Sequence, residues 1–130
     1  MRLACDGYVG PQGQAAWAWV CEDGQRGSGR LPDRVASHLA EWRACSEALA
    51  HLEGHAAGDV VVQVDSALVA KGLAARTPAM SGEAAEMRAA CRQALARLAE
   101  RGVRVRVERV PRERNTEADA LARATAHERA

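Results

Sequence analysis

Three strand-like segments come first in this chain, and helices then alternate with two further strands. The first three segments cover residues 2–9, 15–21 and 26–31, and the turns between them carry Gly-Pro and Asp-Gly signals. Strands that follow one another so closely predict an antiparallel meander. Strands separated by helices predict parallel pairing, because a parallel connection has to cross the sheet. We therefore expect an α/β fold with a mixed five-stranded sheet, three antiparallel and then two parallel strands, and helices on both faces.

The second half of the chain supplies the remaining elements. Valines dominate residues 59–64, which are expected to form a strand buried on both faces. Strict alternation over residues 103–110 predicts a half-exposed strand. Apolar periodicity and the positions of proline and glycine predict helices over residues 32–54, 66–73, 81–101 and 115–128, and a loop over residues 74–81. The 130 residues suit a single domain, residues 1–130.

Charge and composition limit the partners that the chain can take. The net charge of +1, from 18 basic and 17 acidic residues, excludes nucleic-acid binding through a general electrostatic field, so any such contact must be local. The four cysteines match no zinc spacing and are expected to be buried free thiols: Cys5, Cys21, Cys45 and Cys91. Without a signal-peptide core or a membrane-length apolar run, we expect a soluble cytoplasmic monomer that does not bind membranes.

Four carboxylates lie where the predicted fold builds its core: Asp6, Glu41, Asp65 and Asp119. Asp6 follows an apolar strand start, Asp65 ends the valine-rich strand, and Asp119 lies near the start of the last helix. Acids at such places cost folding free energy unless a cation lies among them. Acids contributed by distant parts of a chain are suited to bind a pair of magnesium ions.

Glu41 carries the strongest geometric argument. On a helix that turns about 100° per residue, three apolar side chains lie within about 40° of its direction: Cys45, Ala48 and Leu52. Glu41 is thus expected in the middle of the stripe that faces the core. A glutamate at the edge of the helix is the alternative.

Each of the other acids also has an ordinary structural explanation. Asp65 is suited to cap a helix, Asp6 to start a turn, and Asp119 to interact favourably with a helix N-terminus. Their joint spacing favours a shared site. If the first and fourth strands are neighbours, Asp6 and Asp65 lie side by side, and the first long helix can place Glu41 over them. Carboxylates with open water positions suit Mg²⁺ or Mn²⁺ rather than zinc.

Four sequence blocks resemble the signature blocks of type 1 ribonuclease H, in their order and spacing, across essentially the whole chain. They are Asp6-Gly7, Ala40-Glu41-Trp42-Arg43-Ala44, Val64-Asp65-Ser66-Ala67-Leu68-Val69 and residues 110–122, which contain Pro-Arg-x-x-Asn-x-x-Ala-Asp-x-Leu-Ala. The last two blocks are the more specific ones. The blocks are most similar to those of the compact bacterial and archaeal branch, which has an arginine where other members have a flexible-loop histidine.

The resemblance implies an activity, a cofactor and a partner. Such enzymes hydrolyse the RNA strand of an RNA/DNA hybrid and leave 5′-phosphate ends, with two Mg²⁺ ions, or Mn²⁺, at the site. Carried over by position, Asp6, Glu41 and Asp65 are expected to be metal ligands. Asp119 is expected to hold the ion that activates water. Arg112 stands where the family places a residue that assists at the scissile phosphate, and an arginine suits an electrostatic role there.

The resemblance also indicates substrate-binding residues: Gly7, Tyr8, Ser37, His38, Ser66 and Asn115. Contacts to 2′-hydroxyls in the wide minor groove would distinguish RNA from DNA. The chain departs from the family pattern at Tyr8, where a small hydroxyl residue is usual, and at Ser37 and His38, which replace a pair of asparagines. Asn115 is expected to cap the last helix, with a role in orienting Asp119 as the alternative.

Several other polar residues have two interpretations. Arg104 and Arg106 share one strand face, which is expected to be solvated, with phosphate contact as the alternative. His51 is expected at a surface position of a helix. His127 lies close to the C-terminus, and a tail folded back toward the site is the alternative to a free end.

Alternatives to a hybrid-specific nuclease come from other classes of protein. A related structure-specific nuclease or transposase core would normally be longer and carry added DNA-binding segments. A catalytically weak or silent nucleic-acid-binding module with the same fold would normally have lost one of the acids. A structural domain with fortuitous acids predicts no metal affinity at all.

Overall fold

The computed structural model describes residues 1–55, 58–73 and 82–128, and the loop expected over residues 74–81 lies outside them. The expected order of elements is confirmed. In chain order they are β1 (Arg2–Val9), β2 (Ala15–Cys21), β3 (Arg26–Leu31), α1 (Ser37–His55), β4 (Asp59–Val64), α2 (Ala67–Gly72), α3 (Gly82–Glu100), β5 (Arg104–Arg109), a 3-10 turn η1 (Arg112–Arg114) and α4 (Thr116–Ala126). Within the described ranges, no helix is long and apolar enough to cross a membrane.

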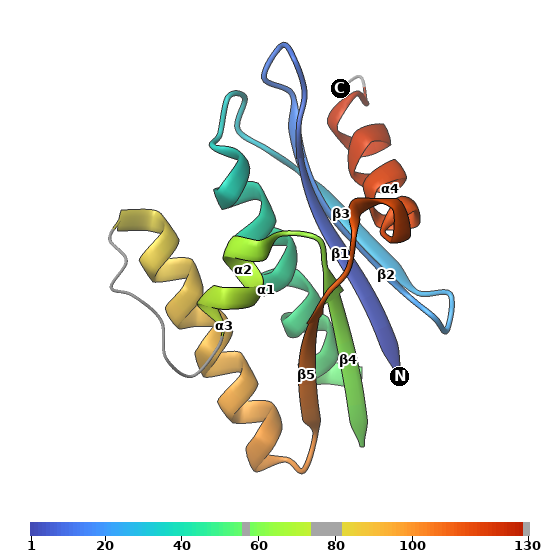
Figure 1. Cartoon of the computed structure of the whole chain (residues 1–130), viewed down its shortest axis with the longest axis vertical. Helices are drawn as coiled ribbons and strands as arrows, with labels where there is room; N and C mark the ends of the chain where they lie inside the picture. Colours follow the sequence, from blue (N-terminus) through green and yellow to red (C-terminus); the bar gives the residue numbers. More distant parts are fainter. Residues whose placement is uncertain (56–57, 74–81, 129–130) are drawn as a thin grey trace.

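The strands form one mixed sheet in the order β3-β2-β1-β4-β5 (Figure 1). β1, β2 and β3 pair antiparallel, whereas β4 is parallel to both β1 and β5. The mixed sheet is therefore confirmed, and so is the adjacency of the first and fourth strands. β1 is the strand at which the pairing changes from antiparallel to parallel, and ligands of open α/β sheets collect beside such a strand.

Helices cover both faces of the sheet. α1 packs on β1 and β2, and α3 packs on α1 and β5, so these two helices build the larger core on one face. α4 packs on β1, β2 and β3, and the side chains of this second interface are small: Ala16, Ala18, Ala118, Ala122 and Ala126. Because these side chains are short, α4 lies close to the sheet, near the middle of β1.

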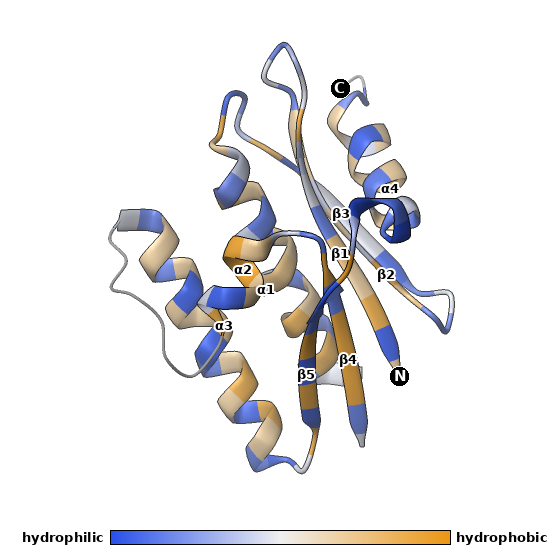
Figure 2. Cartoon of the chain, in the orientation of Figure 1, coloured by the Kyte–Doolittle hydropathy of each residue, from blue (hydrophilic) through white to orange (hydrophobic). Residues whose placement is uncertain are grey.

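Two expectations about individual elements are wrong. α1 begins at Ser37 rather than near residue 33, because Arg34 has a left-handed φ of 64° and donates its N–H to the Gly13 carbonyl (2.7 Å). β4 is fully buried on only one face, since Val61 and Gln63 are partly exposed. Figure 2 shows the expected alternation of apolar and polar residues along β5.

Candidate active site

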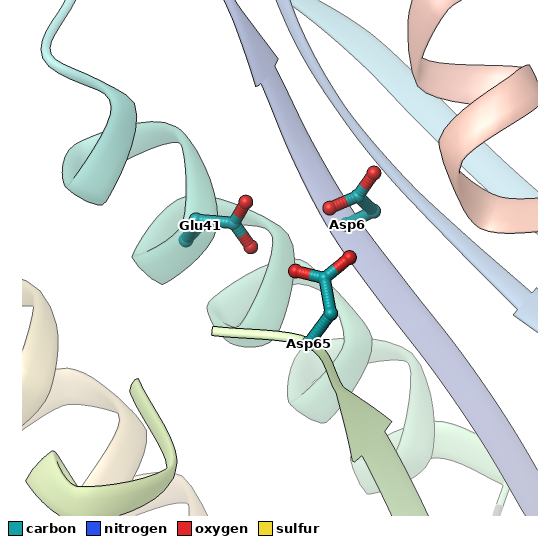
Figure 3. Close-up of side chains that lie close together, drawn as sticks. All are labelled: Asp6, Glu41 and Asp65. Carbon is teal, nitrogen blue, oxygen red and sulfur yellow. The ribbon is translucent and has the colours of Figure 1, made fainter. Parts of the chain in front are cut away.

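Three carboxylates meet where β1 and β4 separate (Figure 3). The pairing of the two strands ends at Ala4 and Gln63, and Asp6 and Asp65 follow on the two diverging chains. Glu41 reaches the same place from α1, so that one oxygen of each carboxylate lies within 4.8 Å of the other two. The predicted grouping of Asp6, Glu41 and Asp65 therefore exists in the structure.

Gly7 sets the distance between α1 and the strand that carries Asp6. A Cβ atom at Gly7 would come well inside 3.0 Å of backbone atoms of Ala40 and Glu41, a separation that real Cβ atoms do not show. A residue without a side chain is therefore required for the helix to rest on the strand. This close approach brings Glu41 to the end of the sheet, so Gly7 shapes the site through packing.

Burial and mutual repulsion disfavour the ionised forms of Asp6 and Glu41. Burial, followed by repulsion from Glu41 and Asp65, raises the pKa of Asp6 to about 10. Burial and repulsion from Asp65 raise the pKa of Glu41 to about 7, although hydrogen bonds from Gly7 and Asp6 and the charge of Arg112 act in the opposite direction. Burial and the neighbouring carboxylates thus favour the neutral form of Asp6 when no cation is bound.

The donor set suits a hard divalent cation. The ligand atoms are all carboxylate oxygens, which Mg²⁺ and Mn²⁺ accept and which zinc and copper sites rarely use without nitrogen or sulfur. A bound cation would offset the repulsion that helps to raise the pKa values of Asp6 and Glu41. No other trio of His, Cys, Asp or Glu side chains in the described ranges comes close enough together to hold an ion. All four cysteines are buried and free, as expected.

The side chain of Asn115 bridges β1 and the residue that follows β4, where the two chains diverge. Its side-chain Nδ2 donates to the carbonyl of Cys5 (3.0 Å) and to Oδ2 of Asp65 (3.2 Å), and the residue is only 1% exposed. The expected role as a side-chain cap of α4 is wrong, because the side chain makes no capping hydrogen bond. Its Nδ2 group donates to β1 and to Asp65, so Asn115 orients Asp65, a member of the carboxylate trio, and not Asp119.

Asp119 lies outside the carboxylate trio. It stands in the first turn of α4, and its Oδ2 accepts a hydrogen bond from Nε of Arg123 (2.9 Å). Asp119 is nevertheless a neighbour of Asp6, because its hydrogen bond and charge contribute to the raised pKa of that acid. The structure therefore places the fourth predicted acid beside the site, paired with an arginine that the sequence analysis did not single out.

An open cleft lies beside two members of the trio, Glu41 and Asp65. It is lined by Ser37, His38, Glu41, Asp65, Ser66, Leu68, Arg109 and Arg112. Six predicted substrate or catalytic residues, all but Leu68 and Arg109, thus share one surface. Ser66 also caps α2 by accepting a hydrogen bond from the N–H of Val69, which excludes Asp65 as the cap of that helix.

Two lining residues of the cleft were missed by sequence reasoning. Arg109 ends β5, and parallel strands end at the same edge of a sheet, so its position next to the end of β4 could have been anticipated. Leu68 is 49% exposed beside the cleft, and the resemblance had marked it only as part of a motif.

Tyr8 points to the face of β1 that α4 covers. Its hydroxyl lies 3.2 Å from Nε2 of His127, which brings the residue just after α4 to the face of β1 that carries Asp6. His51 is not a simple surface residue, because its ring stacks on Trp19 with centroids 4.0 Å apart.

Comparisons with known proteins agree with the fold. The family described as reverse transcriptase-like matches residues 4–125. RNase H1 from the halophilic archaeon Halobacterium salinarum is similar over 95% of each chain, with 27% identity and a TM-score of 0.80. The N-terminal RNase H domain of Rv2228c from Mycobacterium tuberculosis is similar over 96% of this chain and 93% of its own, with 22% identity and a TM-score of 0.82.

A third similar structure contains nucleic acid. LC11-RNase H1 in complex with RNA/DNA hybrid matches 96% of this chain and 95% of its own, with 18% identity and a TM-score of 0.77. LC11-RNase H1 was isolated from compost by a metagenomic approach. A sequence search of curated proteins found no match.

Proposed function

Because the chain belongs to the reverse transcriptase-like family, as a type 1 ribonuclease H, we propose that it is an endonuclease that hydrolyses the RNA strand of RNA/DNA hybrids. The observation that carries this proposal is the carboxylate trio, whose oxygens lie within 4.8 Å of one another at the side of an open cleft. The hybrid bound in the complex of LC11-RNase H1, a similar fold, supports the choice of substrate.

Divalent ions at the trio, Mg²⁺ or Mn²⁺, would supply the activated water and stabilise negative charge on the leaving oxygen. Asp6, Glu41 and Asp65 would hold these ions. Asn115 fixes the carboxylate of Asp65 through its Nδ2, which keeps one ligand oriented before any ion binds. Asp119, beside Asp6, is the fourth ligand that we assign to the site.

The cleft residues have separate roles in this proposal. Arg112 lies at the cleft wall and would stabilise the charge that develops on the scissile phosphate. Ser37 and His38 begin α1 and, with Ser66, present hydroxyl and imidazole groups to the minor groove, where the 2′-hydroxyls of RNA lie. The hydroxyl of Tyr8 is hydrogen-bonded to His127, so we do not assign it a direct hydrogen bond to the substrate.

The decisive experiment compares four labelled substrates: RNA/DNA hybrid, single-stranded RNA, duplex DNA and duplex RNA. Each is incubated with the protein in Mg²⁺, in Mn²⁺ and in EDTA. We expect cleavage of the hybrid alone, only with a divalent ion, and with 5′-phosphate ends. Asp65→Asn should abolish it, because the variant removes one ligand charge while it keeps the size of the side chain.

Other outcomes have defined meanings. Equal cleavage of duplex DNA would indicate a structure-specific nuclease. Tight binding of the hybrid without cleavage in either metal would indicate a binding module. Arg112→Ala should lower turnover while the affinity for Mn²⁺ stays nearly unchanged, and unfolding of this variant would instead assign Arg112 a structural role.

A further inference from the structure

Four side chains form a continuous network on the face of the sheet that α4 covers. They are Asp119 and Arg123 from α4, Tyr8 from β1 and His127 at the end of α4. Tyr8 follows Asp6 by two residues and therefore points to the same face of β1. The network thus begins beside the carboxylate trio and ends near the C-terminus.

Arg123 is held more firmly than a surface arginine usually is. Its Nε donates to Oδ2 of Asp119 at 2.9 Å, in an i,i+4 pair. Such a pair alone is mobile and contributes only about 0.3–0.5 kcal/mol. Here the guanidinium carbon also lies 4.8 Å from the centre of the Tyr8 ring, which is a favourable cation–π geometry.

Tyr8 and His127 are themselves held in place. The Tyr8 hydroxyl lies 3.2 Å from Nε2 of His127, and their rings meet edge to face. The chain next to His127 is fastened to β3, because Arg30 donates to the carbonyl of Glu128 (2.9 Å). One turn earlier, the hydroxyl of Thr125 donates to that of Ser28 (2.8 Å). The platform under Arg123 is therefore tied to two strands.

We propose that Arg123, braced by Tyr8 and His127, is a positioning residue that holds the carboxylate of Asp119 toward Asp6 and the metal site. The inference rests on the proposed function, because it assigns Asp119 to the metal-binding group. Arg123 donates to Oδ2 of Asp119, and we assign the other carboxylate oxygen to the ion. A hydrogen bond to the non-ligating oxygen is the common way in which proteins orient a metal-binding carboxylate.

A guanidinium so close to the site could instead oppose the ion by charge repulsion. The two roles predict opposite effects of removing Arg123. If the arginine positions Asp119, its loss weakens metal binding, and if it competes with the ion, its loss strengthens metal binding. The bracing by Tyr8 favours positioning, because an arginine that has to leave when the ion arrives gains nothing from a fixed platform.

Calorimetric titration of Mn²⁺ into the protein without nucleic acid tests the inference. We expect Arg123→Ala to lower the affinity about tenfold. Arg123→Lys should restore only part of it, since lysine keeps the charge but loses the planar group that stacks on Tyr8. The matched control is Arg43→Ala, which breaks another i,i+4 pair, with Glu47 (2.8 Å), on α1 and should leave the affinity unchanged. Unchanged or tighter binding by Arg123→Ala would overturn the inference.

A second readout uses Tyr8, the only tyrosine in the chain. In protein labelled with ¹³C-tyrosine, one set of ring resonances should shift when Mg²⁺ is added, and this shift should vanish in Asp119→Asn. Tyr8→Phe, which keeps the ring but loses the bond to His127, should weaken Mn²⁺ binding less than Arg123→Ala does. A Tyr8 resonance that does not respond to Mg²⁺ would count against the inference even if Arg123→Ala failed to fold.

These measurements separate the two proposals. Because the titrations contain no nucleic acid, weakened metal binding in Arg123→Ala supports the positioning role even if the protein does not cleave hybrids. Conversely, hybrid cleavage together with an unchanged metal affinity in Arg123→Ala would retain the nuclease and reject the positioning role. In the active enzyme, Arg123→Ala should raise the Mg²⁺ concentration needed for half-maximal rate while KM for the hybrid stays the same.

Discussion

The side chain of Asn115 connects the stability of the fold with the geometry of the site. It is buried and supplies a donor both to the backbone of Cys5 and to Asp65. Asn115→Ala should lower the free energy of unfolding by about 1–3 kcal/mol, because a buried carbonyl loses its donor and Asp65 is released. Urea denaturation measures this change, and Gln12→Ala, which removes an exposed hydrogen bond to Gln14, is the control. Equal unfolding free energies for Asn115→Ala and the parent would contradict the assignment.

The acids of the trio make stability depend on pH in an unusual direction. The pKa of Glu41 is raised from 4.5 to about 7, and that of Asp6 from 3.8 to about 10. Between the unfolded and folded pKa values of each acid, the folded protein therefore binds more protons than the unfolded chain. Stability contributed by Glu41 is therefore full below about pH 4.5 and is lost as the pH rises through about 7.

Thermal unfolding without metal tests this dependence. The melting temperature of the parent should fall as the pH rises from about 4.5 to above 7, and that of Glu41→Gln should fall less. Above about pH 7, the decrease in unfolding free energy should be smaller in the variant than in the parent by on the order of 2 kcal/mol. Added Mg²⁺ should recover much of the loss, because the ion replaces the proton. A parent and Glu41→Gln with parallel pH profiles would show that the repulsion among the acids is relieved in another way.

Prediction from sequence succeeded for side chains whose position follows from the periodic spacing of apolar residues within one helix or strand. Glu41 could be placed because Cys45, Ala48 and Leu52 mark the core face of one helix, and all three are fully buried. Asn115 could not be placed in this way. One partner, Cys5, lies on β1 and the other, Asp65, directly follows β4, and the gap that Asn115 fills exists only because the two chains diverge there.

The contact between α1 and β1 depends on one glycine at the crossing point. Gly7→Ala should destabilise the protein by several kcal/mol or prevent folding, since the added methyl group would overlap the backbone at Ala40. Gly54→Ala is the matched control, because nothing lies within 4 Å of its added Cβ atom and the residue belongs to the same helix. That variant should be stabilised by about 0.5–1 kcal/mol. Chemical denaturation of both proteins gives the comparison, and similar unfolding midpoints would refute the packing role of Gly7.

Element boundaries show where local signals are not sufficient. The order and type of every strand and α-helix followed from hydrophobic period and turn residues, but the 3-10 turn η1 was expected only as a link, and the start of α1 was placed too early. A proline and an aspartate usually open a helix, and here Arg34 turns left-handed to bond with Gly13 in a distant turn. That bond depends on the tertiary approach of two loops, which a local pattern does not contain.

Arginines lie on both faces of β5 and in the turn η1 that follows it. The net charge is only +1, so the attraction of nucleic acid has to come from a few local cations. Arg109 and Arg112 line the cleft. Arg104 and Arg106 are exposed. They alternate along β5 with Val105, Val107 and Arg109, so they lie on the opposite face of the strand from Arg109. The expectation of a solvated face for these two arginines fits their exposure.

Hybrid binding should therefore show a shallow dependence on salt that comes from the cleft. Each phosphate contact contributes a slope of about −0.7 to −0.9 in a plot of log K against log salt concentration. Arg109→Ala and Arg112→Ala should each reduce the slope by about one contact, because each removes a cation that releases counterions. The double variant Arg104→Ala, Arg106→Ala removes two cations from the other face of β5, twice the charge that either single variant removes, and should still leave the slope unchanged. Fluorescence anisotropy with catalytically inactive Asp65→Asn protein measures all of these slopes in Mg²⁺ without cleavage. An equal loss of slope in the double variant would mean that the hybrid wraps around the edge strand and is not confined to the cleft.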